Sequence, residues 1–212
     1  MLYTAFPVLS LMNIFATDSD PIQSARNLCN RHIVKMCVET CQILSFAFPY
    51  SNDVLMKNSN KISHHSHPAS IWCRDSLANM EWLLSHGLAM CEEYTSRYKR
   101  EHASEWRIKW IADHYTELSY LKVGLTPFAR CFGEFKSQLD LTVDDTIEAY
   151  RQFYILDKMS FAKWPSIDVI PDWWPNKDAS FVDKNFKNGI LNPLDITKPT
   201  IKAPKISGEP NL

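Results

Sequence analysis

One long helix is predicted for residues 20–48, which read DPIQSARNLCNRHIVKMCVETCQILSFAF. Asp20 is a residue type that caps helices by accepting a backbone N–H bond. Pro21 suits the first helical position, because its missing N–H has no partner there. Apolar residues then recur at helical spacing, at Ile22, Ala25, Leu28, Cys29, Ile33, Met36, Ile43 and Leu44. Pro49 ends the predicted helix.

Three polar residues of different chemistry flank this apolar stripe. At about 100° per residue, His32, Lys35 and Glu39 project within roughly 60° of one another. A base, an amine and a carboxylate on one helical face can perform proton-transfer chemistry. The alternative is a polar seam whose members satisfy one another between packed helices. Both interpretations remain open at this point.

Composition indicates a folded protein with one good core. The 212 residues are 45% hydrophobic and 12% aromatic, and the few glycines leave room for long helices. The formal net charge of −1 gives no global basic signature, so any nucleic-acid contact must be a local patch. We expect a single helical domain over residues 12–175 and a mobile tail rich in Pro, Lys and Asn over residues 176–212.

The six cysteines contain no C-x-x-C pair and sit mostly on predicted helix faces. They therefore indicate small buried thiols of a reducing compartment, and neither a disulfide framework nor a zinc site. Residues 1–11 are apolar but lack a basic leading region and are too short to span a bilayer. Met12 offers a second plausible start. We expect a cytoplasmic protein with no membrane contact.

Further helices are predicted along the chain, so the expected fold is an all-α, compact bundle of about four helices. One spans residues 69–99 and opens with His67 as cap and Pro68. A short one is marked by two tryptophans at 106 and 110, and another spans residues 143–158. We expect these helices to pack around Ile33, Met36, Leu83, Met90 and Tyr150. Mid-helix Gly87 indicates close helix contact.

The C-terminal stretch is rich in aromatic residues and partly extended. After Pro165 the sequence reads PSIDVIPDWWPNK and then becomes rich in lysine, asparagine and proline. Trp173 and Trp174 are expected to dock on the core, whereas the tail after Asn176 is expected to be extended.

Several common catalytic and ligand motifs do not occur in the sequence. No G-x-x-x-x-G-K-[ST], G-x-G-x-x-G or G-x-S-x-G is present. The run His64-His65-Ser66-His67 lacks the pairing of a common zinc site, so loop and cap roles are favoured over metal binding. We expect no metal and no cofactor.

The start of the second helix carries groups suited to nucleic acid. Arg74 is a fork donor for phosphate, and Trp72 offers a face for base stacking next to His67. The alternative is a buried tryptophan and an Arg74–Asp75 pair within the helix. A second basic cluster consists of Arg97, Lys99, Arg100, Arg107 and Lys109.

The segment Leu28–Glu39, LCNRHIVKMCVE, resembles the first helix of the bacteriophage pyrimidine-dimer DNA glycosylase/AP lyase family. That helix carries Leu, a polar pair, His, an aliphatic residue and a Glu seven positions beyond the His, a spacing that His32 and Glu39 keep. The start of the second helix, with His67, Trp72 and RDSL from Arg74, is similar to the family's second long helix. The chain also resembles uncharacterised phage proteins that begin at the equivalent of Met12 (MNIFATD) and carry HP-x-S-x-W-x-R and LTPFA segments.

The resemblance implies a specific chemistry. In that family the N-terminal amine attacks C1′ of a damaged nucleotide, the base leaves, and a Schiff base leads to β-elimination of the strand. Glu39 would be the carboxylate that stabilises the cationic sugar, with His32 beside it. The amine is either an α-amine near Met12 or, because Met1 lies eleven residues upstream of that start, the side chain of Lys35.

Three hypotheses follow. The first is a DNA-repair glycosylase/AP lyase that acts as a monomer on damaged double-stranded DNA. The second is a non-catalytic relative that binds nucleic acid, and the third is a helical phage accessory protein that acts on a host protein. The expected nucleic-acid contacts are Arg31, His67, Trp72, Arg74, Arg97 and Arg100.

Overall fold

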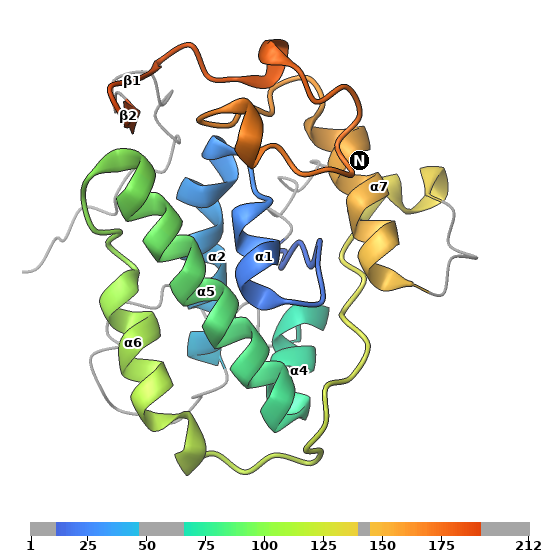
Figure 1. Ribbon diagram of the computed structural model, residues 1–212. Coiled ribbons are helices and arrows are strands. Elements are labelled where there is room, and N and C mark those ends of the chain that lie inside the picture. The colour runs from blue at the N-terminus through green and yellow to red at the C-terminus, as the bar shows by residue number, and fades with distance from the viewer. Residues whose placement is uncertain (1–11, 47–65, 140–144, 192–212) are drawn as a thin grey trace, which may run out of the picture.

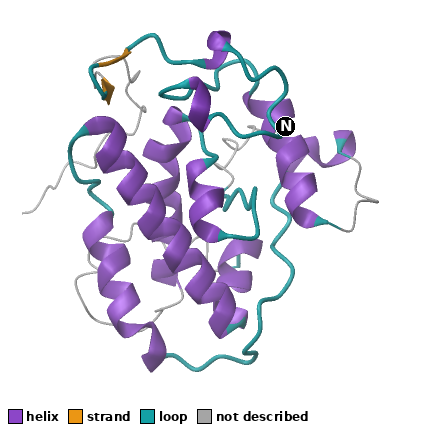
Figure 2. Ribbon diagram, in the orientation of Figure 1, coloured by secondary structure: helices purple, strands orange, loops and turns teal. Residues whose placement is uncertain are grey.

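The computed structural model describes residues 12–46, 66–139 and 145–191. This part of the protein is mostly helical, as the sequence predicts (Figure 2). Its α-helices are α1 (Pro21–Arg26), α2 (Asn30–Phe46), α4 (Pro68–Asp75), α5 (Leu77–Tyr98), α6 (Glu105–His114) and α7 (Thr146–Lys158). Four 3-10 turns lie at Tyr115–Glu117, Gly133–Gln138, Ile167–Val169 and Ala179–Phe181. Strands β1 (Phe186–Lys187) and β2 (Ile190–Leu191) form a small antiparallel hairpin.

Helix α5 is the central element of the bundle. It contacts α1, α2, α4, α6 and strand β2, and Figure 1 shows it crossing the middle of the molecule beside α1 and α2. The five predicted core residues are all fully buried, namely Ile33, Met36, Leu83, Met90 and Tyr150. All six cysteines are buried, as predicted. No helix in the described ranges is both long and apolar enough to cross a bilayer.

The prediction of one continuous helix over residues 20–48 is wrong, because the chain breaks at Asn27–Cys29. One backbone group from each of the four consecutive residues 27–30 binds a distant partner. Trp164 Nε1 donates to the Asn27 carbonyl at 3.1 Å and Arg97 Nη1 donates to the Leu28 carbonyl at 2.9 Å. The Cys29 N–H donates to the Tyr154 hydroxyl at 3.0 Å, and the Asn30 N–H donates to the Lys163 carbonyl at 2.8 Å. These bonds replace the ones that a continuous helix would make.

The predicted helix over residues 69–99 is likewise two helices, with Ser76 in an extended conformation between them (φ −142°, ψ 144°). The segment at Lys122 pairs with this break as a short parallel bridge. The Leu77 N–H donates to the Lys122 carbonyl, and the Lys122 N–H donates to the Asp75 carbonyl, both at 3.1 Å. Here too a distant segment supplies the partners for the interrupted backbone.

The predicted role of Gly87 is confirmed. A Cβ at this position would lie 2.9 Å from Thr40 Cγ2 on α2 and 3.4 Å from side-chain atoms of Ile108 on α6. The bare glycine therefore lets three helices approach closely at one point.

The C-terminal aromatic segment docks on the core, as predicted. Trp174 is buried, with its ring centroid 4.9 Å from that of Trp164, and Trp173 lies edge-on to Tyr154 at 5.9 Å. Residues 178–191 also pack on the bundle, since the Asp183 N–H donates to the Trp164 carbonyl. The division of the chain near residue 176 stays a prediction, and the expected tail beyond residue 191 lies outside the described residues.

Candidate active site

The carboxylate of Glu39 is the centre of the candidate site. Glu39 lies on α2 and is buried, although Lys35, one turn earlier, is more than half exposed. Lys35 Nζ lies 2.8 Å from Glu39 Oε1. The backbone N–H of Asn13 donates to Glu39 Oε2 at 3.0 Å. Each oxygen of one buried carboxylate therefore faces a different nitrogen.

Asn13 is held in place by its own side chain. Its Nδ2 donates to the Cys131 carbonyl at 2.7 Å, and its Oδ1 accepts from the backbone N–H groups of Ile14 and Phe15. Phe15 has a φ of 42°, in the left-handed region that non-glycine residues rarely adopt. The segment before α1 thus bends tightly and directs the Asn13 nitrogen toward α2.

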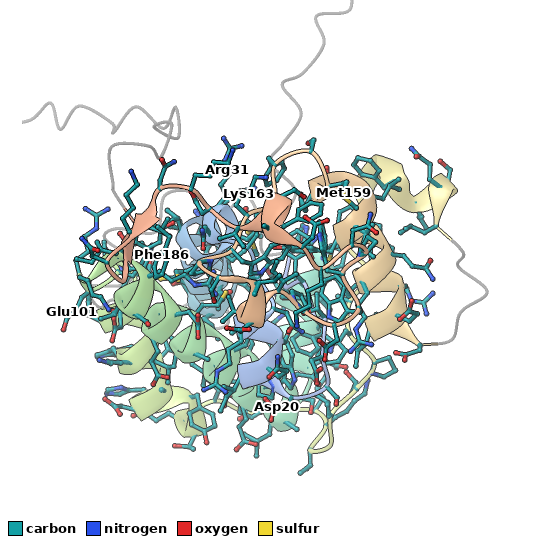
Figure 3. The ribbon with its side chains drawn as sticks, turned by 45° about the horizontal axis from the view of Figure 1, so that its top comes forward. Asp20, Arg31, Glu101, Met159, Lys163 and Phe186 are labelled. Carbon is teal, nitrogen blue, oxygen red and sulfur yellow. The ribbon has the colours of Figure 1, made fainter. Side chains whose placement is uncertain are left out.

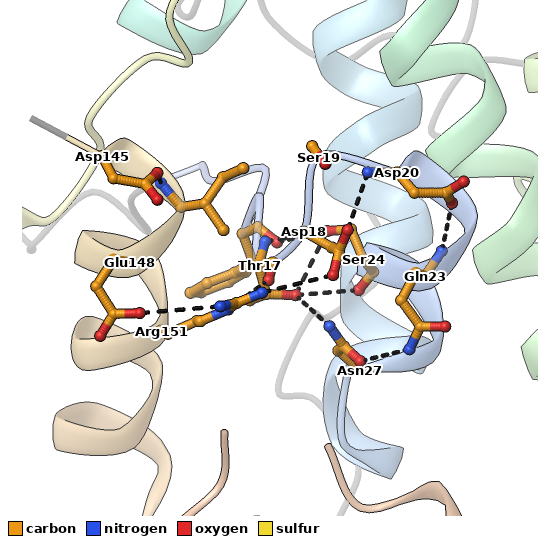
Figure 4. A network of polar contacts seen from close by, with 12 residues as sticks. Thr17, Asp18, Ser19, Asp20, Gln23, Ser24, Asn27, Asp145, Glu148 and Arg151 are labelled. Carbon is orange, nitrogen blue, oxygen red and sulfur yellow. Dashed lines mark hydrogen bonds and ion pairs between the residues drawn. The ribbon is translucent and has the colours of Figure 1, made fainter. Parts of the chain in front are cut away.

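A polar network fixes the other end of this segment against α1 and α7 (Figure 4). Arg151 Nε, on α7, donates to the Thr17 carbonyl at 2.9 Å, and its guanidinium also faces Asp18 and Glu148. The Asn27 Nδ2 donates to Thr17 Oγ1 at 3.2 Å. The network anchors residues 17–18 and so limits the freedom of the segment that carries Asn13.

His32 lies in an aromatic environment next to this segment. Its ring stacks on Phe15 at a centroid distance of 4.8 Å and meets the edge of Tyr154 at 5.0 Å. Burial, followed by the positive charges of Lys158 and Lys35, lowers the pKa of His32 well below its usual value. The imidazole is therefore neutral at physiological pH and is a weaker base than a free histidine, which suits it to orient a partner.

The site thus contains a buried carboxylate, a neutral imidazole, an exposed amine and a backbone nitrogen held at the carboxylate. Glu39 contacts Lys35 on its own helix and the segment before α1. Whether these groups perform chemistry or only satisfy one another stays a prediction.

Comparison with known proteins gives one match. Residues 12–106 match the family model of pyrimidine dimer DNA glycosylase. The resemblance predicted from the sequence is confirmed over this part of the chain. No curated protein and no solved structure was found to match.

The segment that matches the glycosylase family begins at Met12, directly before the nitrogen that contacts Glu39. It runs through α1, α2, α4 and α5 to the start of α6, and so contains every site residue predicted from the sequence.

Arg31 is the expected DNA contact that lies nearest Lys35 in the chain. It is exposed on the first turn of α2, with its guanidinium carbon 5.1 Å from the ring centroid of Phe161. In Figure 3 it lies beside Lys163 at the edge of the molecule. Arg31 and Lys35 are four residues apart, so they share the solvent face of α2.

Arg97 is unsuited to bind phosphate, contrary to the sequence-based expectation. It is 3% exposed. Its guanidinium donates to the Leu28 carbonyl, to Asn30 Oδ1 and to Glu93 Oε2. The reason is the break between α1 and α2, which leaves carbonyl groups that the sequence pattern did not reveal.

Trp72 also lies in the core. It is 6% exposed, its Nε1 donates to the Thr126 carbonyl at 3.3 Å, and its ring contacts Trp82 and Phe128. This favours the structural alternative over base stacking. His67 caps α4 through a bond from the Ala69 N–H to its Nδ1, as predicted.

Two basic residues remain among the expected DNA contacts, Arg74 on α4 and Arg100 after α5. Arg74 is half-buried on α4, and Asp75 pairs with Lys122 at 2.7 Å. Arg100 is exposed and its Nε donates to the Tyr94 hydroxyl. Their contacts with DNA stay predictions. Of the histidine run that includes His67, His64 and His65 lie outside the described residues.

Sequence reasoning missed Asn13 and Phe15. The relevant group of Asn13 is its backbone N–H, which every residue except proline carries, so its side chain gave no signal. The one available signal was the family start at Met12, which places Asn13 at the beginning of the matched segment.

Proposed function

We propose that this protein is a DNA-repair glycosylase/AP lyase that acts on pyrimidine-dimer or abasic DNA through a Schiff base formed beside Glu39. The observation that carries the proposal is the buried Glu39 carboxylate, which has a nitrogen within 3.0 Å of each oxygen. The match of residues 12–106 to the glycosylase family supports damaged DNA as substrate.

The proposed reaction begins when a neutral amine attacks C1′ of the damaged nucleotide. The glycosidic bond breaks, and the base leaves with its electron pair. The ionised Glu39 stabilises the positive charge that develops on the sugar. The C1′–O4′ bond then breaks, O4′ takes a proton, and C1′ becomes the Schiff-base carbon. On an abasic site the amine instead adds to the C1′ aldehyde, and loss of water gives the same Schiff base. Removal of a proton from C2′ then expels the 3′ phosphate by β-elimination. In this proposal Glu39, assisted by the neutral His32 on the same helix, moves these protons.

Two nitrogens are candidates for the nucleophile. Lys35 Nζ is an amine in the full chain, and it must transfer its proton before it attacks, for which Glu39 is the nearest base. The Asn13 nitrogen is equally close to Glu39, but within a continuous chain it is a peptide amide whose lone pair is delocalised. It becomes a nucleophile only in a form of the protein that begins at Asn13.

Borohydride trapping tests the proposal. The full chain is incubated with abasic-site DNA and borohydride, the adduct is digested, and mass spectrometry locates the modified nitrogen. An adduct on Lys35 that Lys35→Ala abolishes identifies the side chain. An adduct that survives this change and maps to the N-terminal peptide identifies an α-amine.

Lys109→Ala is the matched control. Lys109 is 60% exposed and pairs with Glu105 one turn earlier at 2.7 Å, as Lys35 is 56% exposed and pairs with Glu39 one turn later at 2.8 Å. Lys109→Ala should leave trapping unchanged. Absence of both adduct and cleavage on abasic and on pyrimidine-dimer DNA would refute the enzyme. Salt-dependent binding to undamaged DNA would then indicate a non-catalytic DNA-binding relative.

A further inference from the structure

A second group of chemically reactive side chains lies apart from Glu39, where α2, α5 and α6 meet. Cys37 on α2, Cys91 on α5 and His102 in the connection before α6 are all buried. One ligand atom from each, the two sulfurs and a ring nitrogen, lie within 4.8 Å of one another. Among the described residues this is the group with the composition of a metal site. The proposed repair chemistry does not use it.

We propose that Cys37, Cys91 and His102, with Glu105 as fourth ligand, bind a thiophilic divalent cation of the zinc type. Zinc is bound by thiolate, imidazole and carboxylate groups, most often four in a tetrahedron. With metal–sulfur bonds of about 2.3 Å, the two sulfurs of such a site are about 3.8 Å apart. The 4.8 Å limit on the observed separations exceeds this distance by about 1 Å, so the side chains must draw together when the ion binds.

Glu105 is placed to complete the set. It is the first residue of α6, three positions after His102, and its Oε2 is buried without a hydrogen-bond partner in the described structure. Its Oε1 lies 2.7 Å from Lys109 Nζ. The group of ligand atoms within 4.8 Å of one another does not include Glu105, so its carboxylate must turn toward them to become the fourth ligand.

His102 already has the support that metal-bound histidines usually have. One ring nitrogen of such a histidine commonly donates to a backbone carbonyl and fixes the tautomer. His102 Nε2 lies 3.1 Å from the Val34 carbonyl, and Nδ1 accepts from the Ser104 N–H at 3.0 Å. Coordination through Nδ1 keeps the bond to Val34 and exchanges only the Ser104 bond for the metal.

The fold explains why the sulfurs meet. Gly87 allows α5 to touch Thr40 on α2, and Cys91 lies one turn after Gly87. The side chain of Glu105 is 15% exposed beside the exposed Lys109, which gives the cation a route from solvent. Binding replaces two S–H bonds with two metal–sulfur bonds and releases two protons. The bound ion would tie α2, which carries Glu39, to α5 and α6.

Titration of the reduced full chain with Co²⁺, followed by displacement with Zn²⁺, tests the proposal. We expect one Co²⁺ per chain, a sulfur-to-cobalt charge-transfer band, release of two protons, and a melting temperature that rises with Zn²⁺. Cys37→Ser and Cys91→Ser should each weaken binding by more than the roughly 10–100-fold that loss of an outer partner costs. Glu105→Gln should weaken binding while the charge-transfer band remains.

Cys73→Ser is the matched control, because Cys73 is also buried but contacts Met80 at a different place on α5. It should leave Co²⁺ binding unchanged. Should the serine variants fail to fold, ¹¹³Cd nuclear magnetic resonance of the unaltered chain decides. A resonance typical of two sulfur ligands supports the site. A resonance typical of oxygen and nitrogen ligands alone, no binding, or binding that both serine variants retain overturns it.

Discussion

At the scale of single residues, the chemistry depends on whether a buried polar group has hydrogen-bond or ionic partners. Glu39 is buried with Lys35 Nζ in an ion pair at one oxygen and the Asn13 N–H donating to the other. His86 on α5 is fully buried and neither of its ring nitrogens has a hydrogen-bond partner in the described structure. A buried carboxylate that faces a cation and an N–H donor is available to a reaction. An unsatisfied imidazole can only stay neutral, which affects stability instead.

Glu39→Gln tests the catalytic role. The amide keeps the volume and can still accept the Asn13 N–H bond, but it carries no negative charge for the sugar cation. We expect strand cleavage to fall by about 10²–10⁴-fold while DNA affinity survives. Cleavage is measured on abasic duplex DNA and affinity by a binding titration. Glu81→Gln, at an exposed carboxylate on α5 that accepts from the Tyr115 hydroxyl, should cleave normally. Normal cleavage by Glu39→Gln would remove Glu39 from the mechanism.

Acid should destabilise the protein through His86. Burial lowers the pKa of His86 to about 3, against about 6.5 for the unfolded ring. At pH values between about 3 and 6.5, His86 is protonated in the unfolded state but not in the folded state. The free energy of unfolding therefore falls by about 1.4 kcal/mol for each pH unit below 6.5. Above that pH the contribution is constant.

The measurement compares urea unfolding of the wild type and of His86→Leu at pH 7.5 and pH 4.5. Leucine cannot titrate, so His86→Leu should lose less stability on acidification than the wild type. The contributions of the other titratable groups are the same in both proteins and cancel in the difference between them. His32 adds a parallel effect, since its pKa is also lowered, and it remains in both proteins. Equal losses in the two proteins would show that His86 does not titrate as described.

At the scale of elements, periodicity predicted which segments are helical but not where they break. Helical spacing of apolar residues is a local signal, so it correctly identified the core face of α2 and the helical character of residues 77–98. The break at Asn27–Cys29 depends on Trp164 and other residues more than 60 positions away. No local pattern carries that information.

The difference between local spacing and contacts of distant residues also explains which of the two candidate sites could be predicted from the sequence. Lys35 and Glu39 are one turn apart on one helix, so their contact could be predicted from spacing. Cys37, Cys91 and His102 come from separate elements, and only the close approach at Gly87 brings them together. Their sequence spacing resembled no zinc motif.

Gly87→Ala should destabilise the junction of α2, α5 and α6. The added methyl group would lie 2.9 Å from Thr40 Cγ2, and overpacking typically costs about 1–3 kcal/mol. The gain in helix propensity of about 1 kcal/mol offsets part of this. We expect a net loss, measured by urea unfolding. Gly124→Ala is the control, since no atom lies within 4 Å of its added Cβ, and it should be nearly neutral.

Arg97→Met tests the support of the break between α1 and α2. The change leaves the Leu28 carbonyl without this donor and removes a buried partner of Glu93, so we expect a loss of about 3 kcal/mol or more. Arg100→Met, three residues later at an exposed position, should cost far less. Equal midpoints of urea unfolding for the two variants would contradict the structural role of Arg97.

At the scale of the whole molecule, charge near Glu39 matters more than net charge. The chain is close to neutral, and pairing with Glu93, Glu105 and Asp75 engages Arg97, Lys109 and Lys122. Arg31 and Lys35 lie on the exposed face of α2, in the same helix as Glu39, with which Lys35 pairs. DNA that reaches the candidate active site must pass this face, so we expect its phosphates to contact these two residues.

Arg31→Ala should therefore weaken binding to duplex DNA and make the binding less dependent on salt. Each phosphate contact adds about −0.9 to the slope of log affinity against log salt, so loss of one contact should reduce the slope by about that amount. Lys122→Ala is the control, because Lys122 is similarly exposed but follows α6 and pairs with Asp75. Its slope should equal that of the wild type. An unchanged slope for Arg31→Ala would mean that DNA approaches by another face, and the half-buried Arg74 on α4 would become the next residue to test.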